Sequence, residues 1–194
     1  TNTNAIIGNY TNTANPQTIY ARVETIGNPD CYDTTSFDIM IYDTPIANHI
    51  EDIIRCDDAS DGDSANGQVT TDLNALIPDI LSGQSNSEFH VSFHASQVDA
   101  DTNSNPLVSP FQNTIPNQQT IYIRVENVSN MDCYDTTSFR IIVNPIPEAL
   151  DTTLLQCDED GIPEGDTLFN LNEAIDAITG SNNNVTVDFY TTPE

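Results

Sequence analysis

The 194-residue chain has no lysine and no tryptophan, and four arginines are its only basic residues. They face thirty acidic residues, which gives a formal net charge of −26 at pH 7. Binding to nucleic-acid phosphates requires clustered lysine and arginine, so this composition excludes a nucleic-acid partner. The surplus of acidic side chains either keeps the protein surface soluble or is balanced in part by bound cations.

Long hydrophobic runs are also missing. No stretch approaches the ~20 apolar residues that a membrane helix needs, which predicts no direct insertion into a membrane. The chain does not start with the positively charged and apolar segments of a secretion signal. Because the repeats described below are cut at both ends, we expect a piece of a longer protein, and the missing signal leaves localisation open.

Cysteine is scarce, with four residues in the whole chain. They fall two per repeat at matching places, which predicts disulfides and an oxidising, extracellular setting. A zinc site is disfavoured, because the sequence has no Cys-x-x-Cys pair and no paired histidines near the cysteines.

The motif Cys-Tyr-Asp-Thr-Thr-Ser-Phe occurs twice, at residues 31–37 and 133–139. Thr-Ile-Tyr-x-Arg-Val-Glu also occurs twice, at residues 18–24 and 120–126. Both offsets are the same, since 133 − 31 and 120 − 18 equal 102. A fixed period of this size indicates tandem copies of one domain of about a hundred residues.

Proline-containing segments at residues 43–46 and 145–147 follow the last strand of each copy, and we interpret them as linkers. The sequence therefore predicts three parts. Residues 1–44 form the C-terminal part of a first repeat, residues 45–146 a complete repeat, and residues 147–194 the N-terminal part of a third.

Alternating apolar residues predict strands, which we place at residues 18–24, 35–42, 50–55, 69–73, 88–95, 120–126 and 137–143. Apolar residues spaced by three and four predict a helix over residues 73–81, closed by Gly83, and a second over 171–178, closed by Gly180. We expect an all-β fold of tandem immunoglobulin-like antiparallel β-sandwich repeats, with one short helix per repeat and antiparallel pairing throughout.

Acidic residues cluster after Cys56 and again after Cys157. Ca²⁺ takes six to eight oxygen ligands, so clustered carboxylates on a flexible loop suit it, although the spacing is not that of an EF-hand. The alternative is a solvated loop of turn-forming aspartate and glycine. The candidate calcium ligands are Asp57, Asp58, Asp61, Asp63, Asp135, Asp158 and Asp160.

Two disulfide arrangements are compatible with the sequence. In an immunoglobulin-like domain, the segment around Cys56 and the turn before Cys133 are expected at one pole, which favours a Cys56–Cys133 bond and brings Asp135 to the acidic loop. The alternative pairs Cys31 with Cys56 and Cys133 with Cys157, and it requires the proline segment to fold back.

No pattern in the sequence indicates catalysis. The chain has no nucleophile elbow, no phosphate-binding glycine loop and no Cys–His pair at a meaningful spacing, so we expect no enzyme. His90 and His94 alternate with the apolar residues of their strand, which places both on its exposed face as an incidental pair. Tyr32 and Tyr134 either stack on sugars or pack on their own domain, and we favour packing.

Taken together, the two repeated motifs, the Pro-x-Pro segment and the Cys-Asp-Asp/Glu loop resemble the tandem repeats of very large cell-surface adhesins of Bacteroidota. These include proteins of the gliding-motility and type IX secretion class. The resemblance implies export to the cell surface, a filament of stacked immunoglobulin-like domains and Ca²⁺ in loops of this type. It also implies glycosylation at Asp-Thr-x motifs, which this sequence has at Thr34, Thr136 and Thr152.

The sequence thus favours a structural spacer in a long secreted adhesin fibre that supports surface attachment or gliding. Its partners would be the neighbouring repeats of the same chain, and surface polysaccharide or other adhesin filaments. A carbohydrate- or surface-binding module is the alternative, and an accessory domain of a secreted hydrolase is a third hypothesis.

Overall fold

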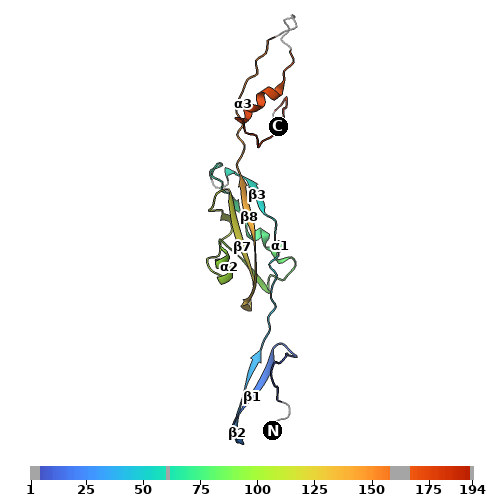
Figure 1. The fold of residues 1–194 in the computed structure, drawn as a ribbon, viewed down its shortest axis with the longest axis vertical. Helices are drawn as coiled ribbons and strands as arrows, with labels where there is room; N and C mark the ends of the chain where they lie inside the picture. Colours follow the sequence, from blue (N-terminus) through green and yellow to red (C-terminus); the bar gives the residue numbers. More distant parts are fainter. Residues whose placement is uncertain (1–4, 60–61, 158–166, 193–194) are drawn as a thin grey trace. The chain divides into compact units, whose positions relative to one another are not determined.

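The structure is a computed structural model that describes residues 5–59, 62–157 and 167–192. The chain is mostly β-structure with a few short helices (Figure 1). It divides into two compact units. Unit 1 comprises Thr1–Asp52, Asp72–Phe111 and Thr120–Arg140, and unit 2 comprises Ile53–Thr71, Gln112–Gln119 and Ile141–Glu194.

The first hairpin of unit 1 consists of β1 (Gln17–Thr25) and β2 (Asn28–Ile39). The strands pair in antiparallel register from Gln17↔Ile39 to Glu24↔Tyr32. Gly27 lies in the turn with a φ of +86°, a conformation that a residue with a side chain rarely adopts. The two strands expected from the first copy of the motif are therefore present and paired as predicted.

The second hairpin repeats this arrangement with β7 (Gln118–Asn127) and β8 (Asn130–Asn144). The third strand, β5 (Phe89–His94), pairs antiparallel with β7 from Phe89↔Asn127 to His94↔Tyr122. β-Branched and aromatic residues alternate along these strands, which explains why the chain is extended here. β8 begins seven residues before the predicted residue 137, because the whole motif continues the hairpin.

The expectation of antiparallel pairing throughout is wrong for β3 (Ile53–Cys56). This strand runs parallel to β8, from Ile53↔Ile141 to Cys56↔Asn144. Parallel neighbours need a long crossover connection, and the 73 residues between the end of β3 at Cys56 and the start of β8 at Asn130 (130 − 56 − 1) supply it. The sheet order is β3-β8-β7-β5, and β4 (Thr70–Thr71) and β6 (Phe111–Gln112) form a separate two-stranded sheet.

The helix predicted at residues 73–81 is present as the 3₁₀ turn η2 (Asn74–Leu76) followed by α1 (Ile77–Leu81). Its left-handed C-cap residue is Ser82, one position before the predicted Gly83. The counterpart consists of η3 (Leu171–Ala174) and α3 (Ile175–Thr179), and Gly180 ends it as predicted. None of the helices in the described residues is long and apolar enough to cross a membrane.

A second helix in the complete repeat, α2 (Gln97–Thr102), was not expected, so the prediction of one helix per repeat is wrong. Ser96 is its N-cap and accepts a hydrogen bond from the backbone N–H of Asp99. This Ser-x-x-Asp spacing is a helix-start signal, but the segment that follows is too short to show an apolar period.

The described core of unit 1 contains the predicted inward residues of β5 and one face of β7. Its members include Leu73, Ile80, Phe89, Val91, Phe93, Ile121, Ile123, Val125 and Phe139, and in unit 2 the buried apolar residues include Val69, Ile141 and Val143. In β7 the opposite face is buried as well, since Arg124 and Glu126 are 4% and 5% exposed. A charged pair therefore lies on a covered face of the sheet.

The two hairpins have nearly the same sequence but different burial. Val125 and Phe139 are 0% and 2% exposed, whereas their counterparts Val23 and Phe37 are 68% and 54% exposed. A lone two-stranded hairpin has no second layer to cover its apolar face. The same hairpin motif is therefore exposed in its first copy and buried in its second.

Candidate functional site: the two ends of the complete repeat

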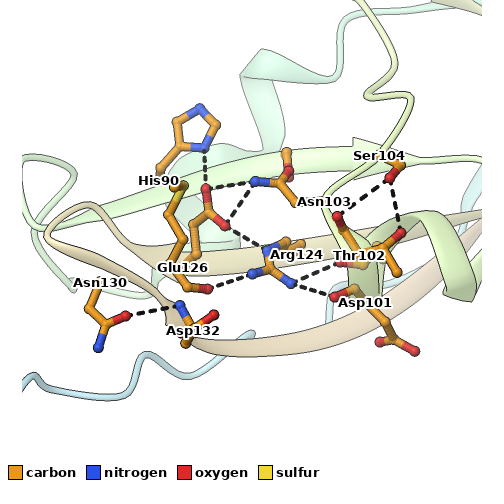
Figure 2. Close-up of polar contacts among 12 residues, drawn as sticks. His90, Asp101, Thr102, Asn103, Ser104, Arg124, Glu126, Asn130 and Asp132 are labelled. Atoms are coloured by element: carbon orange, nitrogen blue, oxygen red, sulfur yellow. Dashed lines mark hydrogen bonds and ion pairs between the residues drawn. The ribbon is translucent and has the colours of Figure 1, made fainter.

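Arg124, in the middle of β7, is the centre of a buried polar cluster (Figure 2). Its Nε donates to Oε2 of Glu126 at 2.6 Å. Its Nη1 donates to the carbonyl oxygens of Ala100 and Asp101 in α2, at 3.0 and 3.1 Å. Because the last carbonyls of a helix have no partner within the helix, Arg124 caps α2 and attaches it to the sheet.

The same guanidinium also holds the β7–β8 hairpin. Its Nη2 donates to the carbonyl oxygen of Met131 at 2.6 Å. Its Cζ lies 3.6 Å from the centre of the Tyr134 ring, in a cation–π contact. The Tyr134 ring therefore packs within its own domain, as favoured from the sequence, and Arg124 occupies one of its faces.

The first hairpin contains the same contacts in an exposed setting. Arg22 bonds Glu24 at 3.1 Å and the carbonyl of Pro29 at 2.6 Å, and its Cζ lies 3.6 Å from the centre of the Tyr32 ring. The side chains of Arg22 and Glu24 are 41% and 50% exposed. The hairpin motif thus builds this cluster locally, and the rest of a repeat buries it.

Glu126 connects the cluster to the residues that follow α2. Both of its carboxylate oxygens accept from Nδ2 of Asn103 at 3.1 Å. Asn103 has a φ of +51°, so it ends α2 in the left-handed conformation that asparagine tolerates. His90 lies 3.8 Å from Glu126 with its side chain 61% exposed, and this contact is long and solvated.

The prediction that both histidines of β5 are exposed is wrong for His94, which is completely buried. Its Nδ1 lies 2.7 Å from the carbonyl oxygen of Ser104, and its Nε2 lies 2.9 Å from Oγ of Ser92. The segment after α2 covers this side of the strand, which the alternation of β5 does not reveal. His94 is a buried, hydrogen-bonded residue and not half of a surface pair.

The hairpin end of the complete repeat, which we define by the β7–β8 turn with Cys133 and Asp135, holds the preceding linker. Nδ2 of Asn127 donates to the carbonyl oxygen of Asp43 at 3.0 Å. The backbone N–H of Ala47 donates to Oδ2 of Asp135 at 2.9 Å, and Ala47 is buried. The linker predicted from its proline thus binds its own repeat through two side-chain contacts that spacing alone does not indicate.

The loop end, which we define by Cys56, Asn144 and the acidic loop, lies at the other end of β8. Asp57 follows Cys56, is 2% exposed, and accepts the backbone N–H of Gly67 through Oδ2 at 2.7 Å. Its Oδ1 is buried and has no hydrogen-bond partner in the structure. An unpaired buried carboxylate oxygen is costly, so it marks a position for a cation, a proton or a water molecule.

Gly67 is held tightly at this end. Its carbonyl accepts from Nδ2 of Asn113 at 3.0 Å and from the backbone N–H of Asn117 at 2.9 Å. A Cβ on Gly67 would lie 2.6 Å from Oδ1 of Asn117, and its φ is +71°. Asn113 is completely buried and joins Gly67, Val69 and Ile115 through its amide. The acidic loop is therefore closed at its base by specific polar contacts.

The predicted calcium ligands are not all brought together. Among the described residues, no group of three histidine, cysteine, aspartate or glutamate side chains lies close enough to hold a metal ion. Asp57, Asp58 and Asp63 belong to the loop end, whereas Asp135 binds Ala47 at the hairpin end. Asp61, Asp158 and Asp160 lie outside the described residues. In the described part of the loop, Oδ1 of Asp57 is a buried carboxylate oxygen without a hydrogen-bond partner.

All four cysteines are free in the structure. Cys56 is the last residue of β3 and lies beside Asn144, whereas Cys133 lies eleven residues earlier on β8 (144 − 133). A strand of that length spans about 36 Å, far beyond the reach of a disulfide. The structure therefore does not bring Cys56 and Cys133 of one repeat together, because β3 runs parallel to β8.

The three glycosylation candidates differ in exposure. Thr34 and Thr152 are exposed, and Thr136 is half-buried. The hydroxyl of Thr136 accepts a hydrogen bond from Nε2 of Gln97 at 3.1 Å. Thr34 and Thr152 therefore offer the more accessible hydroxyl groups for a glycan.

Two carboxyl groups have lowered pKa values. The guanidinium and backbone N–H of Arg140 both donate to Asp52, at distances from 2.5 to 2.9 Å, and this lowers the pKa of Asp52. The pKa of Arg140 is raised by the same contact. Hydrogen bonds from Ser96 and Asn105 lower the pKa of Asp99 at the start of α2. Both carboxyl groups are held ionised for structural contacts.

Over residues 1–45 and 52–147 the chain matches the family described as the Flavobacterium inter-domain disulphide bond domain. Because this match covers more than half of the sequence, the chain belongs to that family of Bacteroidota domains. No curated protein and no solved structure matches the chain. The resemblance drawn from the motifs is thus confirmed at the level of the bacterial group, and a particular adhesin family is not identified.

Proposed function

We propose that the chain is a non-enzymatic spacer segment of an extracellular, cell-surface fibre built from tandem immunoglobulin-like repeats. The observation that carries this proposal is the repetition itself. Two segments match one family, and each contains the same hairpin with the same arginine–glutamate–tyrosine cluster. A unit that recurs with its structural contacts intact suits length and stiffness better than a unique reaction.

The description of the family supports covalent joints between repeats. It names an inter-domain disulphide, and the four thiols of this chain recur at matching positions. Disulfides persist in oxidising compartments, which favours the extracellular setting. In this proposal the disulfide links neighbouring repeats and does not close a loop within one.

Calcium remains the proposed cofactor of the acidic loop. Its support in the structure is the buried Oδ1 of Asp57 without a partner. The loop around it carries further aspartates and a net charge of the right sign. Binding of Ca²⁺ would place a positive charge where an ionised carboxylate is otherwise buried without compensation.

Electron microscopy of the natural full-length protein tests the spacer function. We expect a thin fibre whose length grows in proportion to the number of family domains in its sequence. A compact particle whose dimensions do not change with repeat number contradicts the proposal.

The carbohydrate-binding alternative has its own test. A glycan array probed with the 194-residue chain is expected to show no saccharide-specific signal, and selective binding to one saccharide class would favour the binding module. The hydrolase-accessory hypothesis requires a catalytic domain in the same polypeptide, which the full reading frame would reveal.

A further inference from the structure

We propose that the β1–β2 hairpin of one copy of this chain binds residues 150–157 and 167–192 of a second copy. We call the hairpin the acceptor and these two ranges, which the structure describes, the donor. The donor supplies the acceptor with what β3, α1 and β5 supply to the β7–β8 hairpin within the complete repeat. This goes beyond the proposed function, because it names a partner, a second copy of the chain, and the surface that binds it.

The acceptor has two open edges. Among the described residues, β1 and β2 pair only with each other (Figure 1), whereas β7 also pairs with β5, and β8 with β3. β1 and β2 carry the same motifs as β7 and β8, so the open edges are those that β5 and β3 cover in the complete repeat. The unpaired N–H and C=O groups of an open edge are a template for a strand from another chain.

The acceptor also presents an apolar face. Val23, Phe37 and Ile41 are 68%, 54% and 56% exposed, whereas their counterparts in β7 and β8 are at most 2% exposed. A hairpin of two strands is at best marginally stable alone, and a further layer over its apolar face stabilises it. A binding partner must therefore bring apolar side chains in the arrangement that the complete repeat uses for its own core.

The donor repeats the N-terminal elements of the complete repeat. Its η3 and α3 correspond to η2 and α1. The backbone N–H of Leu150 donates to the carbonyl oxygen of Ile178 at 2.8 Å, as the N–H of Asn48 does to the carbonyl oxygen of Ile80 at 3.2 Å. The donor is therefore already arranged for the packing that the complete repeat shows.

Residues 185–190 of the donor have the alternating sequence of β5 but form no strand. In the complete repeat the same pattern is held as a strand by its pairing with β7. Phe189 is 38% exposed, whereas its counterpart Phe93 is 4% exposed, and Leu171 is 47% exposed, whereas its counterpart Leu73 is completely buried. Donor and acceptor thus both leave exposed the side chains whose counterparts form the core of the complete repeat.

The antiparallel β5–β7 ladder predicts the register at one edge of the acceptor. Transferred to the equivalent positions, it places Val187 of the second copy opposite Val23, and Asp188 opposite Arg22. Residues opposite one another in antiparallel strands lie on the same face of the sheet. An acidic side chain of the second copy therefore meets Arg22, whose side chain is 41% exposed.

The parallel β3–β8 ladder predicts the register at the other edge. Transferred in the same way, it places residues 154–157 of the second copy beside residues 39–42. The sheet formed by the two copies then has the strand order of the complete repeat, β3-β8-β7-β5, with two strands from each copy.

Chain connectivity favours a second copy over closure within one chain. The predicted pairing of the acceptor ends at Tyr42, directly before Asp43, whose carbonyl oxygen accepts from Asn127 at 3.0 Å at the hairpin end of the complete repeat. Pro45 fixes the backbone φ within the same linker. The donor follows Asn144, at the other end of β8, which spans about 50 Å. Closure within one chain therefore requires both linkers to reverse direction, whereas a second copy binds without any reversal.

Each copy carries one acceptor and one donor, so copies join head to tail and the association grows with concentration. Analytical ultracentrifugation of the 194-residue chain measures it, in the presence of a reducing agent that keeps all thiols free. We expect the average mass to rise above the 21.2 kDa of a single chain between micromolar and millimolar concentration. A mass that stays at one chain over this whole range overturns the proposal.

Two variants separate the two surfaces. Val23→Asp places a charge on the acceptor and Val187→Asp places one on the donor, and each variant alone is expected to stay a monomer. A mixture of the two still contains one intact acceptor and one intact donor, so it is expected to form a 1:1 dimer and nothing larger. This dimer uses only unaltered surfaces, so local unfolding around a substitution does not affect the result. Association of either variant alone, or a mixture that stays monomeric, overturns the proposal.

Val98→Asp is the matched control, because Val98 is 70% exposed on α2, outside both the acceptor and the donor. It is expected to associate as the unmodified chain does. Loss of association in this variant overturns the assignment to the acceptor and donor surfaces.

The association of two copies and the spacer function fail separately. Long fibres of the full-length protein together with a monomeric 194-residue chain overturn the association and leave the spacer function intact. A compact full-length particle overturns the spacer function, whatever the 194-residue chain does in the centrifuge.

Discussion

Arg124 and Arg22 occupy the same place in two copies of one hairpin, yet only Arg124 is buried. Arg124 and Glu126 have side chains 4% and 6% exposed, and the guanidinium reaches α2, the hairpin and Tyr134. The planar guanidinium group donates to several acceptors in fixed directions at once, and the ammonium group of a lysine could not make the same set of contacts. At the residue scale, the contacts of this motif are therefore expected to contribute more to the free energy of unfolding in the buried copy than in the exposed one.

We predict that Arg124→Ala destabilises the complete repeat by about 3 to 5 kcal/mol, because it leaves Glu126 buried without its cation. Arg22→Ala is the matched control, and it is expected to cost less than about 1 kcal/mol, since its pair is solvated. Urea unfolding followed by circular dichroism measures both. Equal losses in the two variants would contradict the assignment of a buried cluster.

Asp57 gives a second prediction at this scale. If Ca²⁺ binds the acidic loop, EDTA lowers the melting temperature of the chain by several degrees, because a ligand bound only to the native state stabilises it. Asp57→Asn keeps an acceptor for the Gly67 N–H and removes the charge from the unpartnered position. The variant is therefore expected to lose the calcium-dependent shift while its melting temperature in EDTA changes little.

Asp135→Asn is the control for this measurement, since Asp135 was a predicted ligand but lies at the hairpin end. It should retain the full calcium-dependent shift. Identical melting curves of the unmodified chain with Ca²⁺ and with EDTA would reject the calcium proposal altogether.

At the element scale, α2 depends on Ser96 in two ways. Its hydroxyl accepts from the N–H of Asp99 at 3.1 Å and donates to Oδ2 of the same residue at 2.5 Å. We predict that Ser96→Ala lowers the free energy of unfolding by about 1 kcal/mol, the usual cost of losing an N-cap. Ser36→Ala, at an exposed position of β2, should leave it within about 0.5 kcal/mol, measured by the same urea titration.

The ion pair between Asp52 and Arg140 leads to a prediction about how stability depends on pH. The pKa of Asp52 is lower in the folded state than its ordinary value of about 3.9, so its contribution is complete above that pH. The contribution is lost as the pH falls through the lowered folded pKa. We expect Asp52→Asn to reduce the stability difference between pH 5 and pH 3, measured by thermal melts, and an unchanged difference would contradict this role.

Elements also show where local patterns succeed. The strands at the repeated motifs and the helix ended by Gly180 follow from alternation, spacing and a C-cap glycine, all of which act over a few residues. α2 and the parallel direction of β3 were missed. The first is shorter than the window that reveals a helical period, and the second depends on where the 73 residues between β3 and β8 bring the chain back.

At the scale of the whole molecule, the linker contacts decide how firmly a repeat holds the segment that precedes it. Asp135→Ala removes the acceptor of the Ala47 N–H. A hydrogen bond to a charged group contributes about 1.5 kcal/mol or more, so local opening of the linker should rise roughly tenfold. Limited proteolysis with a protease that cleaves after acidic residues measures this opening, through the rate of cleavage after Asp43.

Asp33→Ala is the matched control, because Asp33 holds the same position in the first hairpin and accepts from Thr34. It should leave the cleavage rate at Asp43 unchanged. If Asp135→Ala is cleaved no faster than the unmodified chain, the contact does not restrain the linker.

The sequence by itself determined the period of 102 residues, the paired strands of both hairpins, the acidic surface and the bacterial group to which the resemblance pointed. These features follow from the pattern of neighbouring residues and from the repetition of whole motifs along the chain. Only the tertiary structure decided that Arg124 is buried and Arg22 is not, that His94 is covered, and that Cys56 and Cys133 lie at opposite ends of β8. The physical reason is that burial and strand direction depend on distant segments packing together, and no local spacing encodes which segment covers which face.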